Sequence, residues 1–301
     1  MIKPPSVISR LTSAATGASN VSDVLPDGTI SNMPWRKTGV KYAQNEIYLD
    51  IIEEVDSILD RNGMIISSEV SGSIVANSRL SGVPDLALSF VDPAVIDDCS
   101  FHPCVRYNRF ERDKVVSFVP PDGPFELMRY RVMNTENSGH VQAPCYCQPS
   151  LSFEYSNNQG SLNIIVGTRS QSSLVFAAGG KKSGPVVVED VSLVIPFSKG
   201  VRTANFTVTA GAVLFDESTK VAKWTIGKLS SDKSPQLSGS VYLQPNSASE
   251  ESPPIEMHWK VPMASLSGLA VASLVLTNER YKPYKGVRAI AKSGKFQIRS
   301  I

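Results

Sequence analysis

Many short runs of β-branched and aromatic residues follow one another along this chain, and each run ends at a turn signal. Residues 120–123 read PPDG and residues 157–160 read NNQG, both between apolar runs. Proline presets φ and glycine accepts a positive φ, so these motifs favour tight turns. No long uninterrupted helical stretch competes with this pattern. Short strands joined by regular turns predict antiparallel β-sandwiches.

Residues 1–33 are rich in Ser, Thr, Gly, Asn and Pro, which is the composition of a flexible linker. From Pro34 onward, the apolar runs predict a series of separate strands. Besides the pair described next, these strands cover residues 72–80, 86–90, 114–119, 125–132, 151–155, 162–166, 185–195, 206–209, 220–226, 239–244, 255–261, 269–277, 286–291 and 296–298.

The stretch Asn45–Val55 reads NEIYLDIIEEV and is ambiguous by periodicity, since both a strand and a helical stripe fit it. Its β-branched and aromatic content favours a strand. Residues 60–63 read DRNG, and Asn-Gly is a strong hairpin signal. We therefore predict that Asn45–Leu59 pairs with Met64–Val70. Side chains i and i+2 share one face of a strand, which places Asp50 beside Tyr48.

The composition of the 301 residues, with 42% hydrophobic and 19% charged, allows a buried core, and the net charge of +2 is too small to imply nucleic acid. No apolar run reaches the roughly 20 residues of a membrane span, and none resembles a signal peptide. The four cysteines are therefore expected to be reduced in the cytoplasm. A secreted immunoglobulin-like receptor with a Cys99–Cys104 or Cys145–Cys147 disulfide is disfavoured, because those loops are short.

The residues that carry chemistry do not assemble a convincing reactive site. His140 with Cys145 and Cys147 lacks the usual C-x-x-C spacing of a zinc site and a fourth ligand. His102 and Cys104 would form a Cys–His dyad only if a turn gave them the right geometry. We expect no catalytic residues, no metal and no cofactor, and hence not an enzyme.

Four motifs carry a specific family resemblance. Residues 35–42 read WRKTGVKY, residues 81–86 read SGVPDL, residues 97–106 read DDCSFHPCVR, and residues 117–131 read SFVPPDGPFELMRYR. The part of the chain that contains these motifs resembles the mu homology domain of clathrin-adaptor medium subunits. Near the end, residues 281–288 read YKPYKGVR and residues 293–297 read SGKFQ, which is most similar to the complex-3 branch of that family.

The resemblance implies an all-β, elongated, immunoglobulin-like β-sandwich mu homology domain made of two subdomains, the second inserted into the first. Subdomain A would comprise residues 34–132 and 263–301, and subdomain B residues 133–262. The loop-like compositions of 134–139 and 246–254 agree with these boundaries.

The resemblance also implies recognition of Tyr-x-x-Φ sorting signals, in which Φ is a bulky apolar residue. Carried over residue by residue, the tyrosine pocket would consist of Tyr48, Asp50, Gly286 and Arg288. The Φ pocket would consist of Ile47, Leu49, Val271, Leu274 and Val287. Asp50 would accept the phenol O–H, and Arg288 would lie over the ring. Taken singly, Asp50 and Arg288 are ordinary surface charges, and the aliphatic residues are ordinary core.

Two positions depart from the pattern of other adaptor complexes, where an aromatic residue replaces Gly286 and a lysine replaces Asn77. We interpret these departures as an altered preference among signals. Cations also concentrate after Glu279, where no acid follows. This predicts either a blunted edge strand or a basic face for phosphoinositides formed by Lys282, Lys285, Lys292 and Lys295.

The predicted function is therefore that of a cargo-recognition module of a vesicle-coat adaptor complex. Its partners would be cytosolic tails of membrane cargo, the large and small subunits of a heterotetrameric adaptor, and membrane phosphoinositides, without nucleic acid. It would act in the cytoplasm, peripherally on Golgi and endosomal vesicle membranes. The alternative is a mu-homology scaffold or endocytic accessory module that does not bind tyrosine signals.

Overall fold

The computed structural model describes residues 33–132, 141–169, 187–245 and 253–299. The predicted linker at 1–33 lies outside these residues except for Met33. The described strands are β1 (Glu46–Leu59), β2 (Ile65–Arg79), β3 (Asp85–Phe90), β4 (Ile96–Phe101), β5 (Val116–Phe118), β6 (Gly123–Val132), β7 (Cys145–Glu154), β8 (Gln159–Thr168), β9 (Val188–Pro196), β10 (Val201–Val208), β11 (Ala212–Asp216), β12 (Val221–Leu229), β13 (Gln236–Leu243), β14 (Ile255–Pro262), β15 (Val271–Thr277) and β16 (Tyr284–Ile298). The described helices are α2 (Tyr107–Asp113) and two 3-10 turns, η1 (Pro93–Val95) and η2 (Tyr155–Asn157). The expected all-β fold is confirmed.

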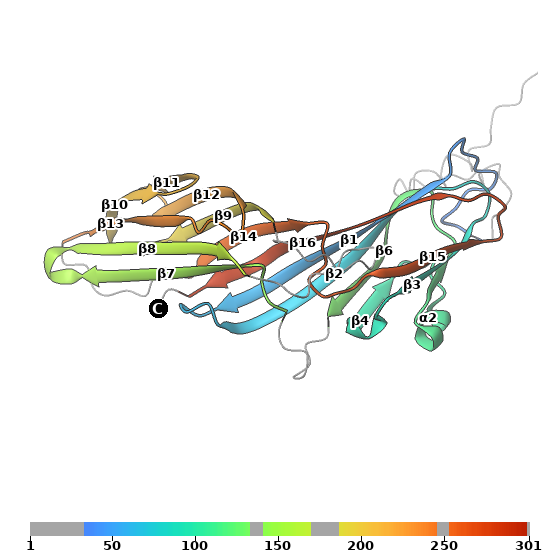
Figure 1. Ribbon diagram of the computed structural model, residues 1–301, viewed down its shortest axis with the longest axis horizontal. Helices are drawn as coiled ribbons and strands as arrows, with labels where there is room; N and C mark the ends of the chain where they lie inside the picture. Colours follow the sequence, from blue (N-terminus) through green and yellow to red (C-terminus); the bar gives the residue numbers. More distant parts are fainter. Residues whose placement is uncertain (1–32, 133–140, 170–186, 246–252, 300–301) are drawn as a thin grey trace, which may run out of the picture. The chain divides into compact units, whose positions relative to one another are not determined.

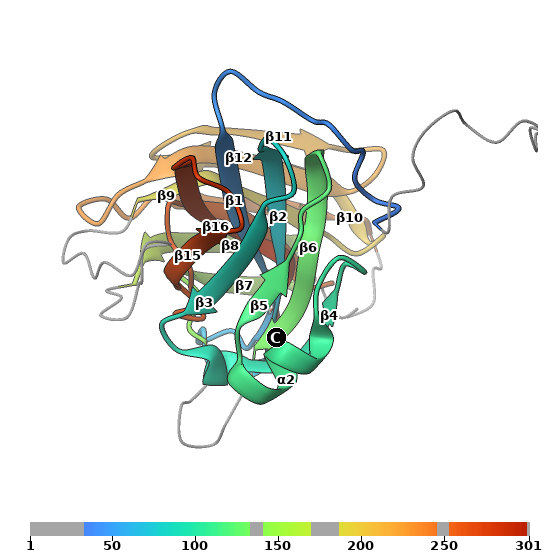
Figure 2. The ribbon, with the colours of Figure 1, turned by 90° about the vertical axis from the view of Figure 1, so that its right-hand side faces the viewer.

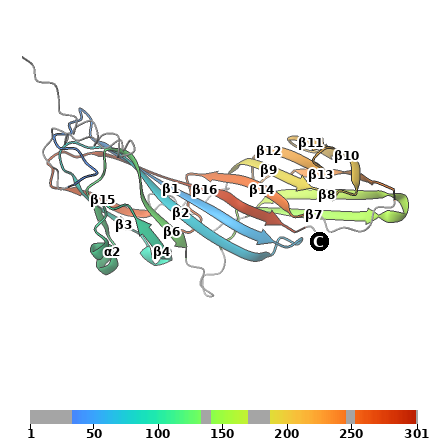
Figure 3. The same ribbon diagram turned by 180° about the vertical axis from the view of Figure 1, so that it is seen from behind.

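The strand β1 lies in the middle of a nine-stranded sheet with the order β11-β12-β9-β14-β16-β1-β2-β6-β4. It runs parallel to β16 and antiparallel to β2, and Figures 1 and 3 show β1 and β16 side by side from opposite directions. The predicted strand over Asn45–Leu59 is confirmed. Ile47, Leu49 and Ile51 are fully buried, and the residues between them face outward. This two-residue alternation is that of a strand and not of a helix.

The turn between β1 and β2 has the expected Asn-Gly chemistry. Asp60 Oδ1 accepts hydrogen bonds from the backbone N–H groups of Asn62 at 2.9 Å and Met64 at 2.7 Å. Gly63 has φ +80°, a conformation that glycine adopts without steric cost. The predicted hairpin is confirmed. The prediction of separate strands at 64–70 and 72–80 is wrong, because β2 runs without a break through Gly72, which stays paired with Glu53 and Tyr130.

Two smaller sheets complete the fold, a three-stranded sheet β15-β3-β5 and a four-stranded sheet β10-β13-β8-β7. Figure 2 shows β15, β3 and β5 together. The PPDG turn does separate two strands, β5 and β6, but they belong to different sheets, so it carries the chain from one sheet to another. Sequence reasoning missed β4 and β11, whose short runs are mostly polar or half-exposed, and the two-turn helix α2.

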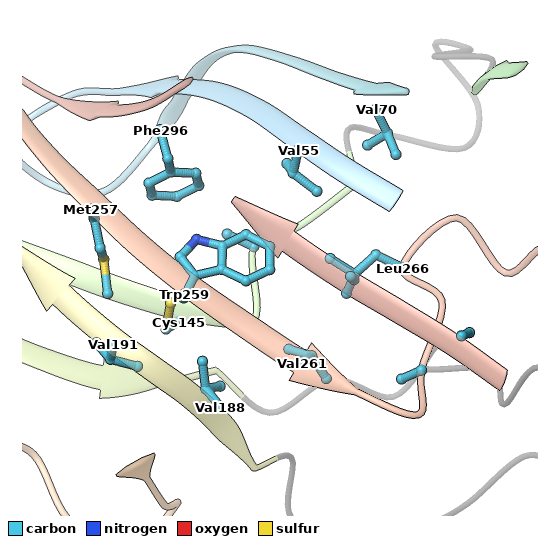
Figure 4. Close-up of a cluster of buried hydrophobic side chains, with 14 of the residues drawn as sticks. Val55, Val70, Cys145, Val188, Val191, Met257, Trp259, Val261, Leu266 and Phe296 are labelled. Carbon is cyan, nitrogen blue, oxygen red and sulfur yellow. The ribbon is translucent and has the colours of Figure 1, made fainter. Parts of the chain in front are cut away.

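One buried cluster joins strands from both predicted subdomains. Trp259 of β14 packs edge-on against Phe296 of β16, with ring centroids 5.8 Å apart. Figure 4 shows these rings with Val55 and Val70 of the hairpin and with Cys145 and Val191. The nine-stranded sheet likewise contains β9, β11, β12 and β14 from residues 133–262. The division into subdomains A and B remains a prediction.

Candidate functional site

The residues of the predicted tyrosine pocket meet on the outer face of the β1–β16 pair. In the parallel register, Tyr48 lies opposite Gly286 and Asp50 lies opposite Arg288. Paired residues of neighbouring strands point to the same side of a sheet, so all four share one face. That face is the exposed one, since the alternate residues Ile47, Leu49 and Ile51 are buried.

Asp50 and Arg288 form a two-pronged ion pair although they are far apart in the sequence. Arg288 Nη2 donates to Asp50 Oδ2 at 2.7 Å, and Arg288 Nε donates to Asp50 Oδ1. These hydrogen bonds raise the pKa of Arg288. The side chain of Arg288 is 60% exposed and that of Asp50 is 23% exposed. The pair therefore contributes little to stability and its groups are available to exchange partners.

The ring of Tyr48 is the aromatic part of this surface. Its O–H donates to Glu46 Oε2 at 3.1 Å, and this hydrogen bond raises the pKa of Tyr48. The ring also lies beside that of Tyr284, with centroids 5.8 Å apart. Asn77, the position of the absent lysine, is the residue opposite Tyr48 on the other neighbouring strand, β2.

One edge of β16 is open beside these residues. β16 pairs with β1 along its length, whereas its pairing with β14 begins only at Ile290, opposite Pro262. Within the described chain, the other edge of Tyr284–Ala289 therefore has no strand partner. An unpaired strand edge presents N–H and C=O groups that another extended chain can pair with.

Three of the predicted Φ-pocket residues lie on the inner side of β1 and β16, and the other two lie on β15. Val287 is the register partner of Leu49 and packs against the buried core. Val271 and Leu274 of β15 are 8% and 7% exposed, while Ile47 and Leu49 have no exposed surface. Of this set, Val287, Val271 and Leu274 are the residues that an incoming side chain could touch directly. Ile47 and Leu49 form the core beneath them.

The four lysines of the predicted basic face are not on one surface. Lys285 lies opposite Ile47, on the inner side, and its Nζ donates to the carbonyl oxygen of Leu274. Lys292 faces outward and is paired with Glu54 at 3.0 Å. Lys295 lies within the irregularity near the end of β16, where its backbone N–H donates to Asp56. Lys282 precedes the strand and is exposed. Because side chains alternate along a strand, Lys285 and Lys292 of β16 point to opposite sides of the sheet.

Glu53 is an important residue that the sequence reasoning left without a role. It is fully buried and accepts five hydrogen bonds, from the O–H groups of Tyr130, Ser265 and Ser267 and from the backbone N–H groups of Leu266 and Ser267. These bonds hold the loop that leads into β15. The sequence contained a signal for this buried carboxylate. Glu53 takes an inward position in the alternation of β1, where the neighbouring inward residues are apolar.

The cysteine and histidine candidates do not form a reactive centre where the structure describes them. Burial raises the pKa of Cys104 and of Cys147 to about 12, so neither is a ready thiolate. His102 Nδ1 accepts the backbone N–H of Cys104 at 3.1 Å and does not contact a thiolate. The described residues contain no group of three potential metal ligands, and His140 lies outside them.

The comparisons with known proteins agree with this architecture. Residues 33–300 match the adaptor complexes medium subunit family. The chain is 46% identical over 302 residues to the AP-3 complex subunit mu of Dictyostelium discoideum, covering 100% of this chain and 68% of that protein. It is 41% identical over 301 residues to the human AP-3 complex subunit mu-1, with the same coverage. The yeast delta-COP-I mu-homology domain matches with a TM-score of 0.61 at 17% identity, over 86% of this chain and 100% of that one.

The chain therefore belongs to the adaptor complexes medium subunit family, and its fold is that of a mu homology domain. Within the family it is similar to the mu subunits of AP-3 complexes, which makes it a component of a vesicle-coat adaptor. No helix among the described residues is long and apolar enough to cross a membrane.

Proposed function

We propose that this chain is the cargo-recognition part of an AP-3-type adaptor and that it binds Tyr-x-x-Φ signals at the open edge of β16. The observation that carries the proposal is the Asp50–Arg288 pair, exposed on the outer face directly beside that edge. It offers a carboxylate acceptor and a planar cation to a phenol, the two groups that such a side chain needs.

The geometry of an extended ligand matches the two sides of β16. A peptide that adds to a strand edge takes affinity from main-chain hydrogen bonds and specificity from side-chain pockets. Residues three apart in an extended chain point to opposite faces. The tyrosine would then meet Asp50 and Arg288 on the outer face, and Φ would meet Val287, Val271 and Leu274 on the inner side.

The wider setting of the proposal follows from the family. The module is non-enzymatic, it assembles with the other subunits of a heterotetrameric adaptor, and it selects membrane cargo on Golgi and endosomal vesicles. Anionic lipid head groups would meet Lys282 and Lys295, because Lys292 is paired with Glu54 and the Nζ of Lys285 donates to a backbone carbonyl oxygen.

Calorimetric titration of a Tyr-x-x-Φ peptide and its Tyr→Ala counterpart tests the proposal. We expect heat from the first peptide and none from the second. Asp50→Ala should weaken binding by about tenfold or more, because a hydrogen bond to a charged group is lost. Glu54→Ala is the matched control, since Glu54 lies on the same face of β1 in an exposed ion pair further along the strand.

A phosphotyrosine peptide provides an independent check of the same contact. The phosphate carries a charge of about −1.5 to −2, which would face the carboxylate of Asp50. We expect it to bind more weakly than the unmodified peptide. Equal heats from the Tyr and Ala peptides, or no heat from either, would reject tyrosine recognition. The chain would then be a mu-homology scaffold that does not bind tyrosine signals.

A further inference from the structure

The two walls of the proposed groove belong to different sheets. β16 lies in the nine-stranded sheet, whereas β15 lies in the three-stranded sheet. Among the described strands, β15, β3 and β5 pair only with one another, so no ladder of backbone hydrogen bonds fixes β15 relative to β16. The position of the β15 wall therefore depends on packing, on the connecting loops and on side chains that cross between the sheets.

The loop over residues 263–270 carries the chain from β14 in one sheet to β15 in the other. β14 ends at Pro262, which still pairs with β16, and β15 begins at Val271, the first residue of the proposed Φ wall. The end of the loop is bonded to the three-stranded sheet, since the backbone N–H of Val91, just after β3, donates to the carbonyl oxygen of Ala270 at 2.9 Å. The first half of the loop is instead bonded to the nine-stranded sheet.

Glu53 of β1 holds this first half of the loop. Its Oε2 accepts the backbone N–H groups of Leu266 at 2.7 Å and Ser267 at 3.1 Å, and its Oε1 accepts the hydroxyl groups of Ser265 at 2.9 Å and Ser267. The Ser267 hydroxyl in turn accepts the backbone N–H of Leu269 at 3.0 Å, two residues before β15. Ser265 and Leu269 have no exposed surface, and Leu266 packs in the buried cluster of Figure 4. A short chain of buried hydrogen bonds thus connects β1 to the start of β15.

Burial makes this connection a strong restraint. A carboxylate that has lost its water must keep its hydrogen-bond donors, and bonds to a charged acceptor are shorter and stronger than bonds between neutral groups. A second side chain also reaches the wall, because the Nζ of Lys285 donates to the carbonyl oxygen of Leu274, but Lys285 is exposed. Water competes for that exposed donor, which leaves Glu53 as the stronger restraint on β15.

We propose that Glu53 is a positioning residue for the Φ side chain: it holds the β15 wall at a fixed distance from β16 and so sets which sizes of Φ are accepted. The proposal rests on the function proposed above and names what determines the specificity of its apolar pocket. Glu53 has no exposed surface, so it acts only through the loop that it holds. A wall that cannot move penalises a side chain that leaves a void or is too large, whereas a wall that moves accepts both.

Two hydroxyl deletions on the same carboxylate oxygen test the proposal in the full chain. Ser265→Ala removes a donor that belongs to the loop, and Tyr130→Phe removes a donor that belongs to β6. Calorimetry measures the affinities of Tyr-x-x-Φ peptides with Φ as Leu or Val. One methylene buried in a close-packed pocket corresponds to about fourfold in affinity, so the wild type should discriminate between these peptides by about that factor. Ser265→Ala should reduce the discrimination about twofold, and Tyr130→Phe should leave it unchanged.

Ser267 gives the strongest variant and its own rescue. Ser267→Ala removes two bonds of the connection and should nearly abolish the discrimination between Leu and Val, whereas Ser267→Thr keeps the hydroxyl and should bind like the wild type. The preference for Tyr over Phe in the peptide should stay unchanged in every variant, because Asp50 and Arg288 lie on the other face of the sheet. Equal changes in Ser265→Ala and Tyr130→Phe, wild-type discrimination in Ser267→Ala, or no discrimination by the wild type would overturn the proposal.

These outcomes separate the two proposals. If the wild-type chain distinguishes Tyr from Ala peptides, the proposed function stands, and the discrimination between Leu and Val decides on Glu53 alone. If the wild-type chain does not distinguish Tyr from Ala peptides, the proposed function fails, and the positioning of a Φ wall fails with it. The melting temperature of each variant confirms that it folds.

Discussion

Two carboxylates of β1, three residues apart, have opposite environments. Glu53 points inward, has no exposed surface, and accepts five hydrogen bonds. Asp50 points outward and pairs with the exposed guanidinium of Arg288. The sequence gives both the same chemical group, and the parity of their positions along the strand separates them.

The different environments of Glu53 and Asp50 indicate which carboxylate can take part in binding. A buried carboxylate loses its hydration, and only a full set of donors offsets that cost. Its donors cannot be exchanged for a ligand without exposing them. An exposed ion pair is worth little to stability, so it can open and accept a new partner at small cost. We infer that Glu53 maintains the structure, whereas Asp50 is available for recognition.

The largest expected effect is that of removing the inner carboxylate. Glu53→Ala leaves buried donors of Tyr130 and of the loop at 265–267 without an acceptor, and should lower the free energy of unfolding by about 3–5 kcal/mol. Chemical denaturation measures it. Glu54→Ala, one residue on and exposed, is the matched control and should change little. A similar loss in both variants would remove the distinction between the two faces.

A smaller effect is expected from one donor of the same network. Tyr130→Phe removes a single hydrogen bond to Glu53 and should cost about 1.5 kcal/mol of stability.

Burial and the charge of Glu53 raise the pKa of Tyr130 well above 10. A raised pKa in the folded state gives stability that is present below the unfolded pKa and is lost as pH rises above it. The difference between wild type and Tyr130→Phe should therefore shrink above about pH 10 in denaturation curves. A constant difference would contradict this.

The smallest effect on stability is expected at the outer carboxylate. Asp50→Ala should change the free energy of unfolding by less than about 1 kcal/mol, while the affinity for the tyrosine peptide falls. Denaturation and calorimetry on the same protein preparation compare the two quantities. A loss of stability as large as that of Glu53→Ala would show that Asp50 is a structural residue, and would weaken its assignment to the pocket.

Much of the fold could be predicted from local pattern. The alternation in Asn45–Leu59 and the Asn-Gly turn predicted the β1–β2 hairpin, because both signals act between residues that are close in the sequence. Breaks in apolar pattern were misleading where a strand continues through them. β16 is one strand although residues 292–295 are polar, since Asp56 and Gly294 accommodate an irregularity there.

The candidate site was reached by resemblance and could not be derived from local pattern. Nothing around Asp50 predicts that Arg288, 238 residues away, is its partner. The burial of Ile47 and Leu49 beneath the proposed pocket also follows from the packing of β1 against other strands. The separation of Lys285 from Lys292 follows from their parity in β16.

By itself the sequence determined that the chain forms many short strands, which faces of β1 are apolar, and where the main hairpin turns, because these depend on neighbours a few residues apart. Only the tertiary structure decided that β1 and β16 run in parallel with Tyr48 over Gly286 and Asp50 beside Arg288. The reason is that a parallel pair is joined by a long connection, so its register is set by the packing of the whole sheet.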